Sequence, residues 1–204
     1  MNEWRIIATV TIGCFAFGLS AMAERKPSDD GTEIIRAEVV EEAPDPIADL
    51  KERQARVKDV FERVAPAVVA LGAADNSKGG WGSGVIVSPA GLILSAGHVT
   101  EATGKDVLIY LAVGRELPGR SLGANMNRDA AMVQIIAAEG TTFPYVDIAD
   151  ADTAELGDWV VALGHPGGYD PTRPAPLRVG RVTQKQSTKL LVTDCTLQGG
   201  DSGG

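Results

Sequence analysis

Short apolar runs separated by turn residues restrict the fold of this chain more than any other feature. The runs are rich in Val, Ile and Leu, and Gly and Pro follow them, as is typical of strands and turns. We expect strands at residues 67–71, 84–87, 92–95, 107–111, 131–136, 159–163, 177–183 and 190–193, and turns at residues 89–91, 117–119 and 165–168. Short strands at this spacing predict an all-β barrel or sandwich with Greek-key-like connections.

Composition narrows the class of protein further. The chain has 204 residues, of which 44% are hydrophobic and 23% are charged, which suits one globular domain with appendages. The formal net charge is −8 and no cluster of Lys and Arg is present in the sequence. Because phosphate contacts need such a cluster, we expect no nucleic-acid partner.

The first 23 residues are organised like an export signal. Arg5 precedes an uncharged, mostly apolar stretch at residues 6–19, and Ala21-Met22-Ala23 has the small-x-small form of a cleavage site. The stretch is shorter than the roughly 20 residues that span a membrane. We therefore expect a signal peptide at residues 1–23 and a periplasmic or secreted protein; a membrane anchor through residues 6–19 is the alternative. Cleavage leaves Cys195 as the only cysteine, so no intrachain disulfide is expected.

Two further segments precede the expected strands. Residues 24–46 are acidic and proline-containing with few large apolar groups, which indicates a flexible linker. At residues 47–65 the apolar positions recur at helical spacing, opposite a face of mixed charge, and Pro66 should end the helix. We expect this face to pack against the barrel: Ile47, Leu50, Val57, Val60, Phe61 and Val64.

A glycine-rich segment near the C-terminus carries the strongest chemical signal. In Gly200-Asp201-Ser202-Gly203-Gly204 a serine hydroxyl lies on a tight loop with few side chains. Such a loop exposes a nucleophile and lets backbone N–H groups converge on one point, which is what attack on a carbonyl requires. A serine used in this way needs a base.

Only two histidines are present, His98 and His165. Two small residues, Ala96 and Gly97, separate His98 from the apolar strand expected at residues 92–95, so its imidazole is expected to lie over a surface. His165 is followed by Pro166 and two glycines, a pattern typical of a residue that shapes a loop. His98 is therefore the candidate base.

An imidazole base needs an acceptor, preferably a shielded carboxylate, to hold its other nitrogen. Asp129 opens the apolar run at residues 130–136, so its carboxylate is expected at one end of the barrel. Asp106 and Asp147 are rivals, but the first follows a solvated turn and the second lies in an acidic stretch. Asp129 is the preferred partner.

The order His98, Asp129, Ser202 resembles that of chymotrypsin-fold serine proteases, and more narrowly of the HtrA (Deg) family. The resemblance covers residues 60–204, and the segments that carry it are Val64-Ala65-Pro66-Ala67-Val68-Val69, Gly82-Ser83-Gly84-Val85-Ile86-Val87, Ser95-Ala96-Gly97-His98-Val99, Arg128-Asp129-Ala130-Ala131, Leu156-Gly157-Asp158-Trp159-Val160, Gly164-His165-Pro166-Gly167-Gly168 and Thr193-Asp194-Cys195-Thr196-Leu197 leading into Gly200-Asp201-Ser202-Gly203-Gly204.

This resemblance implies two six-stranded Greek-key β-barrels after an N-terminal helix, with a protease domain at residues 66–204. The chain ends two residues after the serine, so we expect the second barrel to be incomplete and no PDZ domain to be present. Val99 stands where digestive enzymes have a cysteine, which points to the disulfide-free HtrA-like branch. Two positions depart from that branch: Asp201 and His165 each replace a common Asn.

The resemblance also implies a mechanism and a substrate class. Ser202 is the nucleophile, His98 the base and Asp129 the residue that orients it. The N–H groups of Gly200 and Ser202 form the oxyanion hole, and Leu197 matches a residue that lines the specificity pocket. The implied function is endopeptidase activity on polypeptides, including unfolded proteins, as in HtrA-like quality control.

Two other function classes are considered. A truncated, catalytically inactive barrel that acts as a binding or structural module is the alternative reading. An esterase of the α/β class is disfavoured, because its histidine would follow the serine and its strands would alternate with helices. Metals and organic cofactors are not expected, since the two histidines and one cysteine form no ligand-spaced cluster.

Overall fold

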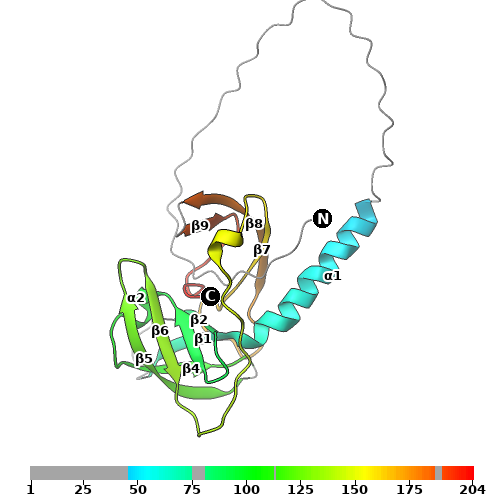
Figure 1. Cartoon of the computed structure of the whole chain (residues 1–204). Coiled ribbons are helices and arrows are strands. Elements are labelled where there is room, and N and C mark those ends of the chain that lie inside the picture. The colour runs from blue at the N-terminus through cyan, green and yellow to red at the C-terminus, as the bar shows by residue number, and fades with distance from the viewer. Residues whose placement is uncertain (1–45, 75–80, 113, 187–189) are drawn as a thin grey trace, which may run out of the picture.

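The computed structural model describes residues 46–74, 81–112, 114–186 and 190–204 (Figure 1). The signal peptide predicted at residues 1–23 and nearly all of the predicted linker lie outside these ranges. Within them, no helix combines the length and the apolar character that crossing a membrane requires.

Strands dominate the described residues, as the sequence predicts. The helical segments are α1 (Pro46–Val64), α2 (Gly97–Thr100) and the short 3-10 turns η1 (Ala65–Ala67) and η2 (Ala151–Thr153). The strands are β1 (Val68–Ala73), β2 (Gly82–Ile86), β3 (Leu92–Ser95), β4 (Asp106–Tyr110), β5 (Glu116–Asn125), β6 (Ala130–Ile135), β7 (Trp159–Leu163), β8 (Leu177–Gln186) and β9 (Leu190–Thr193).

The strands form two units. The first six close into an antiparallel barrel in the order β1-β2-β3-β6-β5-β4, and the last three form an antiparallel sheet in the order β7-β8-β9 (Figure 1). A closed six-stranded barrel, a second partial sheet and a preceding helix are consistent with the chymotrypsin-like fold. The predicted fold class is confirmed.

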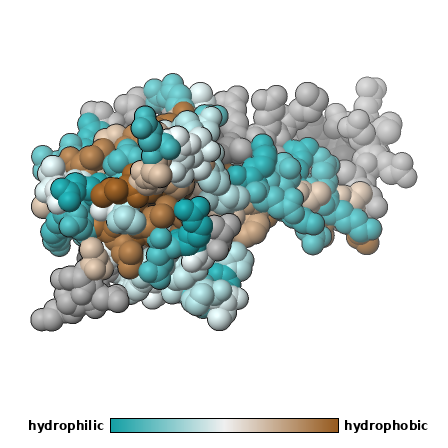
Figure 2. Space-filling view, turned by 90° about the horizontal axis from the view of Figure 1, so that it is seen from below, coloured by the Kyte–Doolittle hydropathy of each residue, from teal (hydrophilic) through white to brown (hydrophobic). Residues whose placement is uncertain are grey.

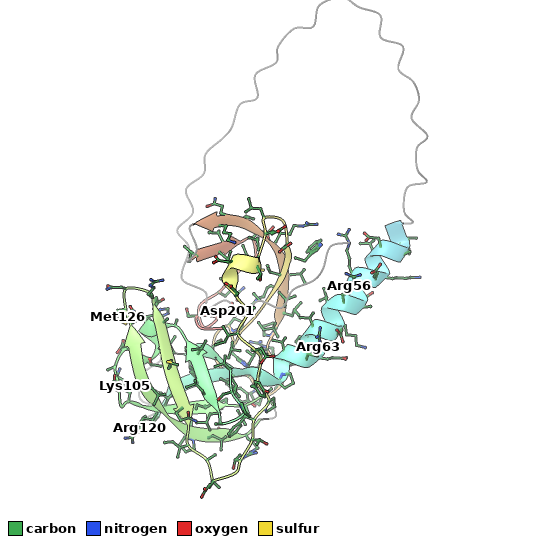
Figure 3. The ribbon with its side chains drawn as sticks, viewed as in Figure 1. Arg56, Arg63, Lys105, Arg120, Met126 and Asp201 are labelled. Atoms are coloured by element: carbon green, nitrogen blue, oxygen red, sulfur yellow. The ribbon has the colours of Figure 1, made fainter. Side chains whose placement is uncertain are left out.

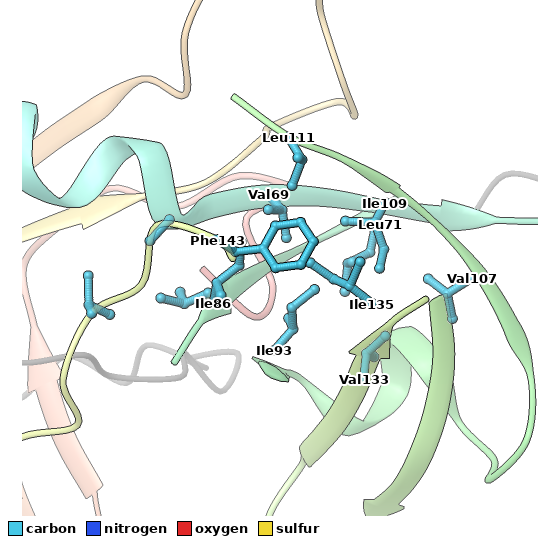
Figure 4. Close-up of a cluster of buried hydrophobic side chains, with 13 residues drawn as sticks. Val69, Leu71, Ile86, Ile93, Val107, Ile109, Leu111, Val133, Ile135 and Phe143 are labelled. Carbon is cyan, nitrogen blue, oxygen red and sulfur yellow. The ribbon is translucent and has the colours of Figure 1, made fainter. Parts of the chain in front are cut away.

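The barrel encloses the main hydrophobic core, to which alternate positions on its strands contribute. On β6, for example, Ala131, Val133 and Ile135 point inward, while Met132, between the first two, is exposed. Burying one such aliphatic side chain contributes about 1.5–3 kcal/mol. The buried members of the core are Ala67, Val69, Leu71, Val85, Ile86, Ile93, Val107, Ile109, Leu111, Val133, Ile135, Phe143 and Val146 (Figure 4).

The three-stranded sheet has a much smaller apolar cluster. Its buried members are Val68, Leu163 and Ala175, and half-buried residues from the end of α1 and from β7 and β8 pack around them. Because Val68 belongs to β1, this cluster lies against the barrel. Tyr110 of the barrel also stacks on Tyr169, which follows β7, with ring centroids 4.7 Å apart.

One expected turn is wrong. Residues 117–119 lie inside β5, where Pro118 pairs with Leu108 of β4 and its carbonyl accepts the Ile136 N–H at 2.8 Å. Gly119 passes so close to Ile109 that a Cβ at this position would lie 2.3 Å from Ile109 Cδ1. The glycine therefore reflects close packing within the barrel rather than a change of chain direction.

Helix α1 is confirmed, but only part of its apolar face packs as expected. Val60 is buried, and Phe61 and Val64 pack against the apolar clusters. By contrast, Ile47 and Leu50 are 62% and 63% exposed. The helix extends past the body of the molecule with a largely hydrophilic surface, so its first turns have no barrel beneath them (Figures 1 and 2).

Candidate active site

The pairing of β3 with β6 brings the candidate base and its partner together. Ser95, the last residue of β3, lies opposite Ala131 near the start of β6. The chain leaving β3 turns into α2, which carries His98, and the chain entering β6 passes through Asp129. Both side chains therefore lie beyond the same end of the barrel, as the sequence predicts for Asp129.

His98 and Asp129 make a close, multiply bonded pair. His98 Nδ1 lies 2.7 Å from Asp129 Oδ2 and 2.9 Å from Oδ1, and the backbone N–H of His98 donates to Oδ1 at 2.8 Å. The Asp129 side chain is 19% exposed and that of His98 is half exposed. Burial acts to raise the pKa of Asp129, but the hydrogen bonds from His98 outweigh it and hold the pKa below its ordinary value.

Local backbone geometry supports this pair. Asp129 has φ +48°, in the left-handed region that Asp and Asn tolerate better than most residues. Gly97 passes beneath it, and a Cβ there would lie 3.1 Å from Asp129 Oδ1. An ionised Asp129 accepts the Nδ1–H of His98, which leaves Nε2 with a lone pair able to take up a proton.

The two rival carboxylates lie elsewhere. Asp106 is exposed at the start of β4 and pairs with Arg120 of β5 at 2.9 Å. Asp147 is exposed in the segment that follows the barrel. The structure brings neither of them to His98.

Residues 198–201 form a tight turn just before the candidate nucleophile. The N–H of Asp201 donates to the carbonyl of Gln198 at 3.0 Å, and Gly200, the third residue of the turn, has φ +102°. A positive φ at this position is what a type II turn requires and is the reason for glycine there. A Cβ on Gly200 would also lie 2.5 Å from the carbonyl oxygen of His165.

The N–H groups of Gly200 and Ser202 are among those of this loop that have no partner in the described part of the chain. The Gly199 carbonyl accepts from Gly167 N–H at 2.8 Å, and the Asp201 carbonyl accepts from Gly204 N–H at 2.9 Å. Because a trans peptide points its N–H opposite to its C=O, these bonds fix the directions of the Gly200 and Ser202 N–H groups. Neither N–H donates to another described residue.

The loop is attached to the barrel through Ser83 on β2. The Ser83 N–H donates to the Ser202 carbonyl at 2.8 Å, and the Ser83 hydroxyl donates to the Gly200 carbonyl at 2.7 Å. The same hydroxyl accepts the His165 N–H at 2.8 Å. Gly203 packs so tightly that a Cβ would lie 2.8 Å from the N atom of Ala96, two residues before His98. These contacts place Ser202 next to the segment that carries His98.

The Ser202 hydroxyl itself makes no hydrogen bond with any residue that the structure describes, His98 included. Leu197, the candidate specificity residue, precedes the turn and is 36% exposed. His165 is buried, and its pKa is lowered mainly by that burial. Over the described ranges no group of three or more His, Cys, Asp or Glu side chains is arranged to hold a metal.

Two contributors to this site were not identified from the sequence. Ser83 lies in an apolar strand, and only the structure shows that its hydroxyl joins the loop at residues 198–204 to the barrel. Because this loop carries the candidate nucleophile Ser202, we call it the nucleophile loop. Arg178 on β8 forms an ion pair with Asp201, the residue before Ser202 (Figure 3 labels Asp201). The available signal was an arginine next to an apolar strand start, which does not reveal a partner 23 residues away.

Comparison with known proteins agrees with this geometry. A family model described as a trypsin-like peptidase domain matches residues 82–204, more than half of the chain. The chain belongs to the trypsin-like peptidase family. The resemblance to the HtrA (Deg) branch is confirmed by relatives with DegP-like names.

Three relatives illustrate the match. A "Probable periplasmic serine endoprotease DegP-like" of Chlamydia pneumoniae is 31% identical over 60% of this chain and 25% of its own length. A protein of the same name from Ectopseudomonas mendocina is 29% identical over 78% of this chain and 33% of its own. The "Putative serine protease HhoA" of Synechocystis is 30% identical over 61% of this chain and 33% of its own. The matched region thus spans a quarter to a third of these relatives.

Proposed function

We propose that this protein is a serine endopeptidase in which Ser202, His98 and Asp129 form the catalytic triad. The observation that carries the proposal is the His98–Asp129 pair, in which two contacts of 2.7 and 2.9 Å hold Nδ1 and leave Nε2 available. The glycine-framed Ser202 lies on the adjoining loop, tied to the segment before His98 through Gly203.

The proposed reaction proceeds by acyl transfer. Ser202 Oγ attacks the carbonyl carbon of the scissile bond while His98 Nε2 takes the hydroxyl proton. The imidazolium then protonates the leaving amine, and water repeats the sequence to release the acid product and regenerate the hydroxyl. Asp129 holds His98 in the required tautomer and stabilises the imidazolium. Contacts between nucleophile and base are often long without substrate and tighten when it binds, which is compatible with the unbonded Ser202 hydroxyl.

The N–H groups of Gly200 and Ser202 are proposed to stabilise the oxyanion. Their directions are fixed by the carbonyl bonds from Gly167 and Gly204, so they are organised before substrate arrives. Preorganised donors of this kind contribute roughly 3 kcal/mol each in the enzymes where one has been removed.

The biological role we propose is HtrA-like quality control of unfolded proteins in an exported compartment, since relatives are named as periplasmic.

For substrates, we infer polypeptides with a small or medium apolar residue before the scissile bond, selected in part by Leu197. Cleavage of a peptide library after small and medium apolar residues is the expected result. Cleavage mainly after Lys or Arg would contradict this assignment.

The experiment that tests the chemistry is labelling with a fluorophosphonate, which phosphylates activated serines. The full chain should be labelled, and Ser202→Ala should abolish the label. Ser88→Ala, which removes a hydroxyl from the β2–β3 turn, serves as a matched control and should label like the wild type. Equal labelling of wild type and Ser202→Ala would refute the proposal, and an unlabelled wild type would favour an inactive binding module.

A further inference from the structure

A largely buried ion pair involves Asp201, the residue that directly precedes the candidate nucleophile. Arg178 donates from Nη1 to Asp201 Oδ1 at 2.9 Å and from Nη2 to Oδ2 at 2.7 Å. The two side chains are 17% and 3% exposed. Among the described residues this is the only ion pair in which both side chains are less than one-fifth exposed.

The Asp201 carboxylate is held on several sides. Its Oδ2 also accepts the backbone N–H of Gln198 at 2.9 Å, which closes the turn before Ser202. Gly164 packs beneath it, where a Cβ would lie 2.7 Å from Oδ1. Arg178 in turn donates from Nη1 to the Pro176 carbonyl at 3.2 Å. The position of Asp201 is therefore set by β8, by the end of β7 and by its own turn.

The position of Asp201 determines two peptide groups that matter for the proposed chemistry. Ser202 N–H belongs to the peptide that starts at Asp201, and Gly200 N–H belongs to the turn that the carboxylate closes through Gln198. A rigid bidentate fork fixes both the distance and the plane of the carboxylate, which a single point charge does not.

The charge of the Asp201 carboxylate also indicates a role for Arg178. A buried carboxylate without a cation is strongly disfavoured, and it would repel the negative charge that develops on the substrate oxygen nearby. Arg178 neutralises Asp201 behind the loop, so the N–H groups of Gly200 and Ser202 act without an opposing field.

On this basis we propose that Arg178 is a positioning residue for the nucleophile loop, acting through Asp201 to hold the oxyanion-binding N–H groups and Ser202 in place. This inference rests on the proposed function. It predicts that Arg178 affects the rate of attack by Ser202, and that this effect is largely lost when Asp201 is replaced by Asn.

The test compares fluorophosphonate labelling rates of the full chain with thermal unfolding of the same samples. Arg178→Met should slow labelling about 100-fold at a temperature where the variant is fully folded, the size of effect produced by misplacing a reacting group by about 1 Å. It should do so at every pH, because the base His98 is untouched. Arg178→Lys keeps the charge but loses the fork and should give an intermediate rate.

The matched control is Arg181→Met on the same strand. Arg181 bonds the Gly157 carbonyl and stacks on Trp159, away from the nucleophile loop. Its labelling rate should stay within about twofold of the wild type, as expected for a change far from the reacting groups.

The deciding comparison uses Asp201→Asn. In that background, adding Arg178→Met should change labelling less than about threefold, because contacting residues are non-additive when one acts through the other. This arm also holds if Arg178→Met alone does not fold. Wild-type labelling by folded Arg178→Met, or a full 100-fold loss in the Asp201→Asn background, would overturn the inference alone. An unlabelled wild type would instead refute the proposed function.

Discussion

The barrel and the three-stranded sheet hold their parts of the site by different means. The barrel positions His98 and Asp129 by strand pairing around a large apolar core. The sheet has a small apolar cluster, and the nucleophile loop beside it is held by hydrogen bonds to Ser83 and by the Arg178–Asp201 pair. Packing thus positions the proposed base, while directional polar bonds position the proposed nucleophile. The barrel and the three-stranded sheet should therefore respond differently to mutation.

The largest expected effect is a loss of peptide hydrolysis when the pair of His98 and Asp129, which the barrel positions, is disrupted. Asp129→Asn should lower the rate of peptide hydrolysis about 10⁴-fold, because an amide N–H facing His98 Nδ1 forces the wrong tautomer. Stability should change little, since Asn tolerates the φ of +48°. Steady-state kinetics on a peptide substrate and a thermal melt measure both. Asp106→Asn, in the exposed pair with Arg120, should retain full activity; if it is the damaging change instead, the assignment of Asp129 is wrong.

The next effect tests the difference in packing. Ile93→Ala removes a fully buried side chain from the barrel core and should lower the free energy of unfolding by about 2–5 kcal/mol. Leu163→Ala in the smaller cluster should cost about 2 kcal/mol, at the low end of that range, because fewer neighbours surround it. Denaturant unfolding gives both values. Met132→Ala on the exposed side of β6 is the control, and equal costs at residues 93 and 163 would remove the distinction.

The difference between the barrel and the nucleophile loop also explains which features could be predicted from the sequence. The positions of His98 and Asp129 were predictable because each lies next to an apolar run with a clear period, and strand pairing does the rest. Strand β5 was missed because Pro118 and Gly119 read as a turn, while their purpose is close packing over Ile109. Ser83 and Arg178 were missed because their roles depend on contacts between segments far apart in the chain, which no local pattern encodes.

A smaller effect is expected when the hydrogen bonds that attach the nucleophile loop to the barrel are removed without a large change in packing. Ser83→Ala leaves the His165 N–H and the Gly200 carbonyl without their partner and should lower stability by about 1–3 kcal/mol. Fluorophosphonate labelling should slow as well, since the loop loses its tie to β2. Ser121→Ala is the matched control, because Ser121 is equally buried in the barrel but its hydroxyl has no partner among the described residues. Similar losses of stability in both variants would show that the hydrogen bonds of the Ser83 hydroxyl do not account for the effect.

The smallest effect concerns pH and again separates the two halves. Burial lowers the pKa of His165 from its ordinary 6.5. Below about pH 6.5 the unfolded chain therefore binds a proton that the folded chain does not. As the pH is lowered through this range, the free energy of unfolding should fall by at most about 1.4 kcal/mol per pH unit. The fall ends once the pH passes the lowered pKa of the folded state. Acidification should thus destabilise the folded state through His165, which follows the first strand of the three-stranded sheet.

Denaturant unfolding between about pH 7.5 and 5 measures this dependence above the range where carboxylates titrate. His165→Gln should flatten the slope. Tyr169→Phe keeps the neighbouring ring and should retain the wild-type slope. An unchanged slope in His165→Gln would assign the pH dependence to another group.

The position of Ser83 has a consequence for the order of assembly. Its hydroxyl and its N–H reach the nucleophile loop only when β2 is in place between β1 and β3, because only then is Ser83 fixed in the barrel wall. The barrel therefore provides the template on which the loop that carries Ser202 is placed. A partly folded molecule lacks that template, so the nucleophile loop matures only in chains whose barrel has already closed.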